Sequence, residues 1–220
     1  QPANAECRKG SLVIEARRER VANARYDANS QDWRRARQQA DYTSACVLTR
    51  RKHEWLYGRF EMRGKIDVRP GLWPAFWTLG SARGWPGCGE IDVMEAYRGK
   101  LLANFCWQGP RRKPAWDAVE RSLADFGADW TAQWHVWRLD WEPHRAAIYV
   151  DDVLLNEIDL AQSVNAGREA SNPFHEPHYL LLNLAVGGTQ GGDPGATDMP
   201  GRFEVDYVRV YQLGAAGSGS

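Results

Sequence analysis

Short runs of alternating hydrophobic and polar residues, separated by turn residues, dominate this chain. In residues 57–62 (YGRFEM), Phe60 and Met62 alternate with Arg59 and Glu61. Alternation with period two is typical of strands that bury one face. On this basis we expect strands at residues 11–16, 42–49, 57–68, 72–79, 89–97, 101–107, 134–141, 145–150, 179–186 and 202–211. Many strands at this spacing predict an all-β sandwich of two antiparallel sheets.

Helical spacing is rare in the chain. Trp116, Val119, Leu123 and Phe126 recur at intervals of three and four, which predicts a helix over residues 114–126 as a surface insertion. A second helix candidate, at residues 31–40, is rich in Arg and Gln.

Residues 98–100 (RGK) are typical of a hairpin turn. We expect one domain over residues 1–213, with no internal repeat, followed by a flexible tail at 214–220 (GAAGSGS).

Composition narrows the function classes. A chain of 220 residues can bury a substantial core, and 28 basic residues balance 28 acidic ones. With no net charge, nothing in the composition would recruit nucleic acid or an anionic membrane. No apolar run is long enough to insert into a bilayer. Eleven tryptophans are the unusual feature, because aromatic faces stack on the apolar faces of sugars. We assign Trp134, Trp137 and Trp141 to the core.

Three carboxylates, Glu90, Asp92 and Glu95, lie within six residues of the segment GEIDVMEAY. In a regular strand Glu90 and Asp92 share a face, whereas Glu95 points to the other side. A β-bulge at Val93 or Met94 would return Glu95 to the face of the other two. The sequence therefore predicts a bulged strand with three acids on one face.

This arrangement suits hydrolysis of a glycosidic bond with retention, in which two carboxyl groups about 5 to 5.5 Å apart act as nucleophile and general acid/base. Glu90 and Glu95 can take these two roles. Asp92 between them would share a proton with a neighbour, and like charges this close raise a pKa. The alternatives for such a motif are a solvated acidic strand and half of a cation site.

Six runs of the sequence, taken in order, resemble glycoside hydrolase family 16, and especially its laminarinase-like branch: DYTSACVLTR, YGRFEMRGKI, GLWPAFWTLG, WPGCGEIDVMEAYRG, LNLAVGG and RFEVDYVRVYQ. The resemblance covers about residues 11–212. It implies a β-jelly-roll sandwich with a substrate cleft across its concave sheet. It also implies Glu90 as nucleophile, Asp92 as the assisting acid and Glu95 as general acid/base.

Four tryptophans are candidates for binding substrate. Trp73 and Trp77 share one face of the strand at 72–79. Trp107 is expected across a hairpin from Glu90, on the following strand. Trp85, five residues before Glu90, resembles a position repeated in this branch of the family.

Cysteine and metal chemistry stay open. Cys7, Cys46, Cys88 and Cys106 allow three complete disulfide pairings, and free buried thiols are the alternative. The proposed chemistry requires no cofactor and no metal. The resemblance implies a structural calcium site formed by two parts, an aspartate that Asp206 resembles and an opening segment with its strand. This sequence lacks that segment before residue 11, and the lack argues against calcium here.

Three functions follow from these observations. The first is a retaining endo-β-glycanase acting on β-1,3-glucan of the laminarin type. The second is an endo-hydrolase of a galactan such as agar, porphyran, carrageenan or β-1,3-galactan. The third is a glycan-binding lectin, for which paired acids would be dispensable. A polysaccharide hydrolase meets its substrate outside the cytoplasm, so we expect a secreted, extracellular or periplasmic protein; oligomeric state is left open.

Overall fold

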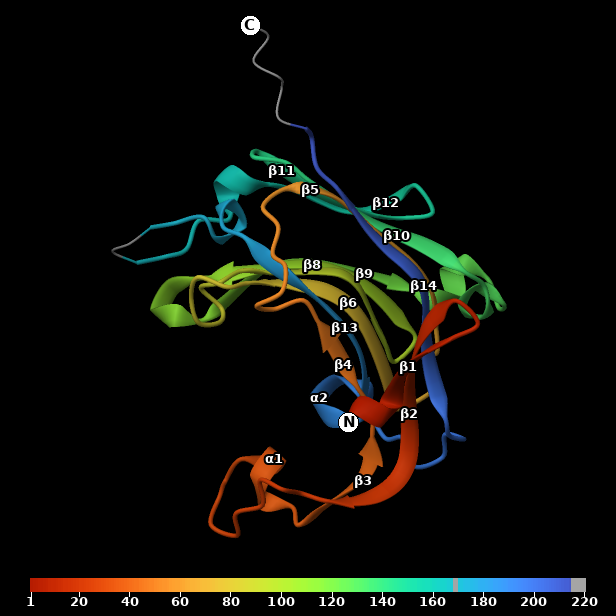
Figure 1. Cartoon of the computed structure of the whole chain (residues 1–220). Helices are drawn as coiled ribbons and strands as arrows, with labels where there is room; N and C mark the ends of the chain where they lie inside the picture. Colours follow the sequence, from red (N-terminus) through yellow and green to blue (C-terminus); the bar gives the residue numbers. More distant parts are fainter. Residues whose placement is uncertain (168–169, 215–220) are drawn as a thin grey trace, which may run out of the picture.

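Two antiparallel β-sheets packed face to face make up the fold (Figure 1). The computed structural model describes residues 1–167 and 170–214. The predicted all-β sandwich is therefore confirmed. The predicted tail at 214–220 lies outside the described residues, except for Gly214.

The first sheet has eight strands. In spatial order they are β1 (Ala5–Arg8), β2 (Ser11–Ala22), β14 (Gly201–Tyr211), β5 (Gly58–Ile66), β10 (His135–Trp141), β11 (Arg145–Val150) and β12 (Val153–Asp159), with β3 (Gln39–Thr43) paired to β2. The second sheet has six strands, in the order β4 (Cys46–Leu48), β13 (His178–Val186), β6 (Leu72–Gly80), β7 (Glu90–Tyr97), β8 (Lys100–Gln108) and β9 (Pro114–Ser122).

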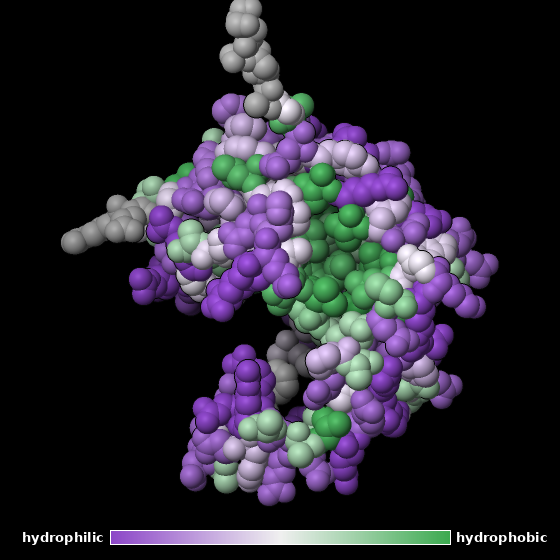
Figure 2. Space-filling model, in the orientation of Figure 1, coloured by the Kyte–Doolittle hydropathy of each residue, from purple (hydrophilic) through white to green (hydrophobic). Residues whose placement is uncertain are grey.

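Helices are short in the described residues. The two α-helices are α1 (Trp33–Ala36) and α2 (Gly188–Gly191), and 3-10 turns form at Pro2–Asn4, Pro110–Arg112, Leu123–Phe126, Trp130–Ala132, Leu160–Gln162 and Pro173–His175. No helix of the described chain is long and apolar enough to cross a lipid bilayer. The segment that carries α1 and β3 projects from the sandwich, and Figure 2 shows a deep hollow between the two.

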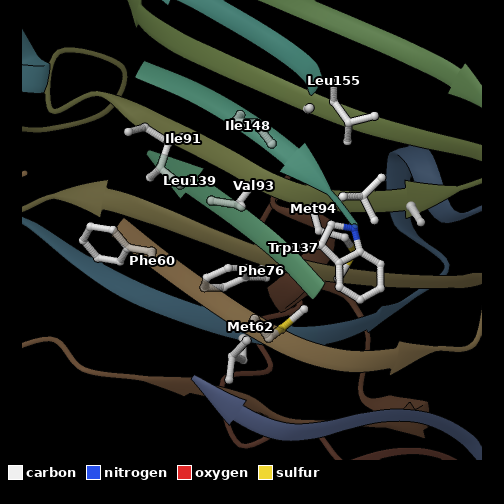
Figure 3. Close-up of a cluster of buried hydrophobic side chains, with 14 of the residues drawn as sticks. Phe60, Met62, Phe76, Ile91, Val93, Met94, Trp137, Leu139, Ile148 and Leu155 are labelled. Atoms are coloured by element: carbon white, nitrogen blue, oxygen red, sulfur yellow. The ribbon is translucent and has the colours of Figure 1, made fainter. Parts of the chain in front are cut away.

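The hydrophobic core lies between the two sheets (Figure 3). Alternate residues of facing strands fill it, because strand side chains point to opposite faces in turn. Fully buried members include Phe60, Met62, Phe76, Ile91, Val93, Met94, Trp137, Leu139 and Ile148. The assignment of Trp137 and Trp141 to the core is confirmed. Trp134 is half-buried instead, with the Arg63 guanidinium 4.9 Å from its ring centre.

The predicted helix over residues 114–126 is wrong. Residues Pro114–Ser122 form strand β9, and only Leu123–Phe126 make a 3-10 turn. Each residue of β9 pairs with one of β8, so its backbone groups that face β8 bond across the ladder and not within a helix. Partial burial at every second residue from Ala115 to Val119 is the strand period that the helical spacing concealed.

The second predicted helix, at 31–40, is mostly wrong. Only Trp33–Ala36 is helical, with Asp32 as its N-cap accepting a hydrogen bond from the Arg34 N–H, and Gln39 already begins β3. The strand expected at 42–49 divides into β3 and β4, which belong to different sheets. The pairing of β3 with β2 and of β4 with β13 decides where these strands begin and end. The residue pattern within the segment does not predict that pairing.

Besides β9, two strands were missed. β12 pairs with β11, and β1 forms a hairpin with β2 in the register Ala5↔Ile14, so a short strand does precede residue 11. The predicted turn at 98–100 is confirmed, because Tyr97 pairs with Lys100. Its two central residues, Arg98 and Gly99, have positive φ angles of 48° and 73°, as two-residue hairpin loops require.

Candidate active site

The strand that carries the three carboxylates contains the predicted bulge. Along β6, Leu79 pairs with Glu90 and Trp77 with Asp92, but Ala75 pairs with Glu95. Two steps along β6, from Trp77 to Ala75, therefore span three steps along β7, from Asp92 to Glu95, and the ladder to β8 shifts in the same interval. The bulge restores the parity, so that all three acids point to one face of the six-stranded sheet.

Burial on the other face agrees with that register. Val93 and Met94 are adjacent in sequence, yet both are fully buried in the core between the sheets (Figure 3). Consecutive residues of a regular strand point to opposite faces. Because both side chains point inward, Glu95 returns to the outer face, four positions from Glu90 along the regular strand β6, which is about 13 Å between backbones.

Glu90 is held by two hydrogen bonds. The indole Nε1 of Trp85 donates to Glu90 Oε2 over 2.5 Å, and Asp92 donates to the same carboxylate. Burial raises the pKa of Glu90 above its usual value, while these two donors oppose that rise. The donors favour the charged form, so Glu90 is the acid of the three best placed to ionise.

Asp92 is buried between the two glutamates, with an exposed fraction of 5%. Burial and the charges of Glu90 and Glu95 raise the pKa of Asp92 well above its usual value. Asp92 therefore stays protonated, and its O–H donates a hydrogen bond to Glu90. The Asn104 amide nitrogen lies 3.3 Å from Asp92 Oδ2 and 3.5 Å from Glu95 Oε2, which fixes both carboxyl groups from β8.

Glu95 has the properties of an acid that is protonated near neutral pH. Burial raises the pKa of Glu95 to about 7. A hydrogen bond from Trp73 opposes this rise, and the charge of Glu90 adds to it. Trp73 Nε1 donates to Glu95 Oε1 over 2.7 Å, and the Trp73 ring lies edge-on to Tyr97. Environments that separate the protonation of two nearby carboxyl groups are what acid/base catalysis needs.

The structure brings three of the four candidate tryptophans to the carboxylates. Trp73 and Trp85 bond directly to Glu95 and Glu90, and Trp77 lies opposite Asp92 with its Nε1 donating to Asn183 Oδ1 over 2.6 Å. Trp107 is the exception.

The register explains why Trp107 lies elsewhere. Cys106 pairs with Glu90 and shares its face, so the next residue, Trp107, points to the opposite face and packs against the core. The structure therefore corrects the expected position of Trp107 by one residue of register.

Three further residues share the carboxylate face and were not singled out from the sequence. Asn104 and Asn183 lie opposite Asp92 and Ala75, and Trp116 on β9 pairs with Cys106. Trp116 is 45% exposed at the edge of this sheet, a suitable place for a ring that stacks on a sugar. The sequence of residues 115–119 (AWDAV) shows no alternation that would have placed it, because the period of two appears only in the burial of these residues.

The four cysteines are free. The alternative of free buried thiols holds for Cys88 and Cys106, whereas Cys7 and Cys46 are exposed. Asp206 forms an ion pair with Arg63, whose Nη1 donates to Asp206 Oδ2 over 2.7 Å. Among the described residues, no group of three or more His, Cys, Asp or Glu side chains is placed to hold a metal ion.

Sequence comparison connects this geometry with known enzymes. The chain is 37% identical over 187 residues to glucan endo-1,3-beta-glucosidase A1 of Niallia circulans, a match that covers 79% of this chain but only 27% of that protein. The model for glycosyl hydrolases family 16 matches residues 15–209.

Structural comparison gives the same result. The laminarinase catalytic domain of Thermotoga maritima MSB8 has a TM-score of 0.79 and 32% identity, covering 98% of this chain and 82% of that one. A structure from work on endo-acting O-glycanases, with which members of the human gut microbiota initiate mucin breakdown, has a TM-score of 0.87 and 33% identity, covering 96% and 77%. With the family model matched over most of its length, the chain belongs to the glycosyl hydrolases of family 16.

Proposed function

We propose that this domain is a retaining endo-β-glycanase that hydrolyses β-1,3-glucan of the laminarin type by double displacement. The observation that carries the proposal is the bulged strand β7, which presents Glu90, Asp92 and Glu95 on one face in three different protonation environments. The similarity to a glucan endo-1,3-beta-glucosidase and to a laminarinase supports the choice of glucan.

The reaction would proceed in two steps. Ionised Glu90 attacks the anomeric carbon, the glycosidic C–O bond breaks, and protonated Glu95 gives its proton to the departing oxygen. Glu95, now a carboxylate, then takes a proton from water. The resulting hydroxide attacks the anomeric carbon, releasing Glu90 and a sugar of retained configuration. Asp92 donates its hydrogen bond to Glu90 and so steadies that carboxylate as a leaving group in the second step.

The pH profile of kcat/KM is expected to decline on its basic side near pH 7. Glu95 must hold a proton in the first step, and its pKa is raised to about 7, so the active fraction falls as the pH rises through that value. On the acid side, activity falls as Glu90 becomes protonated, at a pKa that burial raises above its usual value. Initial rates on laminarin, measured over a range of pH, give both the acidic and the basic side of the profile.

The control for that profile is Glu95→Gln with an aryl β-glucoside, whose leaving group departs without a proton. The residual activity of this variant should lack the basic limb. A parent profile that stays flat between about pH 6 and about pH 9 would contradict Glu95 as the acid.

Trp77→Ala is expected to weaken glycan binding about tenfold, about 1.4 kcal/mol, with little loss of thermal stability. Trp77 is half-buried on the carboxylate face, so its removal opens no core cavity. The matched control is Trp137→Ala, which removes a fully buried ring and should cost about 3 to 5 kcal/mol. Melting temperature and affinity for laminarioligosaccharides, measured in a Glu90→Gln background, separate the two roles. A large drop in the melting temperature of Trp77→Ala with unchanged affinity would assign Trp77 to the core.

The proposed substrate is tested by release of reducing ends from laminarin, lichenan, agarose, carrageenans and mucin O-glycans. We expect laminarin to be cleaved fastest, at internal bonds. Faster cleavage of a galactan or of the O-glycans would replace the glucan assignment. Tight glycan binding without hydrolysis of any of them would indicate a lectin. A substrate of this size also implies that the protein works outside the cytoplasm.

A further inference from the structure

A groove adjoins the carboxylates at the Glu90 end of strand β7. It has a volume of about 870 Å³ and is lined by three loops, at residues 83–87, 108–112 and 165–167. Trp85 connects the groove to the reaction centre, because this residue lines the groove and donates its indole hydrogen bond to Glu90. A glycan whose scissile bond lies at Glu90 can therefore continue into this groove.

The three loops are fastened to one another by hydrogen bonds, so the groove is a built feature. The buried Asn165 donates from Nδ2 to the Gly87 carbonyl and accepts the backbone N–H of Gln108 at Oδ1, both over 2.8 Å. Gln108 in turn donates from Nε2 to the Ala166 carbonyl. A network that is satisfied in this way holds the groove in shape before a ligand arrives.

Two consecutive arginines stand at the rim of this groove in an unusual backbone conformation. Arg111 and Arg112 have φ angles of 58° and 59°, in the left-handed region that favours Gly and Asn. Both are exposed, and within the described residues neither guanidinium makes an ion pair or a hydrogen bond. Asn-Gly would form the same two-residue turn at lower cost in backbone strain.

Every charged residue among the described residues that line the groove is basic. The described residues that line the groove include the two unpaired guanidinium groups of Arg111 and Arg112 and no aspartate or glutamate. A concave surface with one sign of charge concentrates ligands of the opposite sign. The planar guanidinium matches the oxygen pair of a carboxylate or of a sulfate in a bidentate arrangement.

We propose that this groove is a subsite for a sugar that carries an anionic substituent, a sulfate ester or a carboxylate, and that Arg111 and Arg112 bind that oxyanion. The inference rests on the proposed function, because it extends the same glycan beyond the cleaved bond. It adds affinity for glucan chains that carry such a substituent.

The test compares three ligands that differ only in charge: neutral laminarioligosaccharides, the same chains carboxylated at C6, and the same chains sulfated. Binding is measured calorimetrically in a Glu90→Gln background, so that nothing is hydrolysed. We expect at least one of the anionic ligands to bind about tenfold more tightly than the neutral one at low ionic strength, with the advantage shrinking in about 0.5 M salt. The sulfated and carboxylated arms identify the anion.

The informative variant is Arg111→Asn with Arg112→Gly, which suits the left-handed turn and should fold at least as well as the parent. It should abolish the preference for the anionic ligand and leave binding of the neutral one unchanged. The matched control, Arg145→Gln with Arg209→Gln, removes the same charge from the other sheet and should keep the preference.

Equal affinity for anionic and neutral ligands, including no binding of either, would overturn the inference. So would a preference that survives in the Arg111 and Arg112 double variant. The proposed function is judged separately, by whether the parent hydrolyses neutral laminarin.

Discussion

Replacing Glu90 with Gln is expected to reduce hydrolysis of laminarin by several orders of magnitude while the sandwich stays folded. The amide has nearly the shape of the carboxylate and can still accept the Trp85 hydrogen bond, but it cannot attack the anomeric carbon. Each factor of ten in rate corresponds to about 1.4 kcal/mol of transition-state stabilisation.

The stability of this variant is also informative. Burial raises the pKa values of Glu90, Asp92 and Glu95, and the charges of neighbouring acids add to the rise at Asp92 and Glu95, which means that the folded state disfavours these charges. Removing one charge should therefore leave the melting temperature equal or higher. Glu61→Gln, on the other sheet, serves as the control for activity. Turnover by Glu90→Gln within about tenfold of the parent would remove Glu90 from the mechanism.

An alanine inserted after Met94 is expected to abolish activity almost as completely. The present bulge contains one extra residue, and one more reverses the parity of everything that follows it in β7. Glu95 would then point into the core beside Met94, where an unpaired carboxylate is costly. The variant should lose hydrolysis and either lose stability or expand the bulge.

Deletions at the same place are the matched comparison. Removing Met94 or Val93 gives a regular strand in which the three acids still alternate onto one face, so partial activity is expected. Rates on laminarin and circular dichroism of the insertion and deletion variants measure the contrast. An insertion variant with parental activity, and with no larger bulge in its structure, would show that parity is not what places Glu95.

The sequence alone was sufficient for the sandwich and for the carboxylate face. Both depend on a local rule, the alternation of side chains along a strand, and that rule requires only the spacing of Glu90, Asp92 and Glu95 together with one bulge. The same parity correctly placed Trp73 and Trp77 on the face of the acids. Hydrophobic alternation likewise located the core tryptophans Trp137 and Trp141.

Tertiary structure decided whatever depends on which segment lies beside which. Trp107 lies off the carboxylate face and Trp116 lies on it because the ladders between β7, β8 and β9 set the register. A shift of one residue in register moves each side chain to the opposite face of the sheet. The hydrogen bond of Trp73 to Glu95 joins two strands, β6 and β7, that meet only in the folded sheet. The groove beside Glu90 likewise joins loops up to 84 residues apart, from Arg83 to Gly167. Contacts at such separations are fixed by packing and strand pairing, and no local pattern of residues records them.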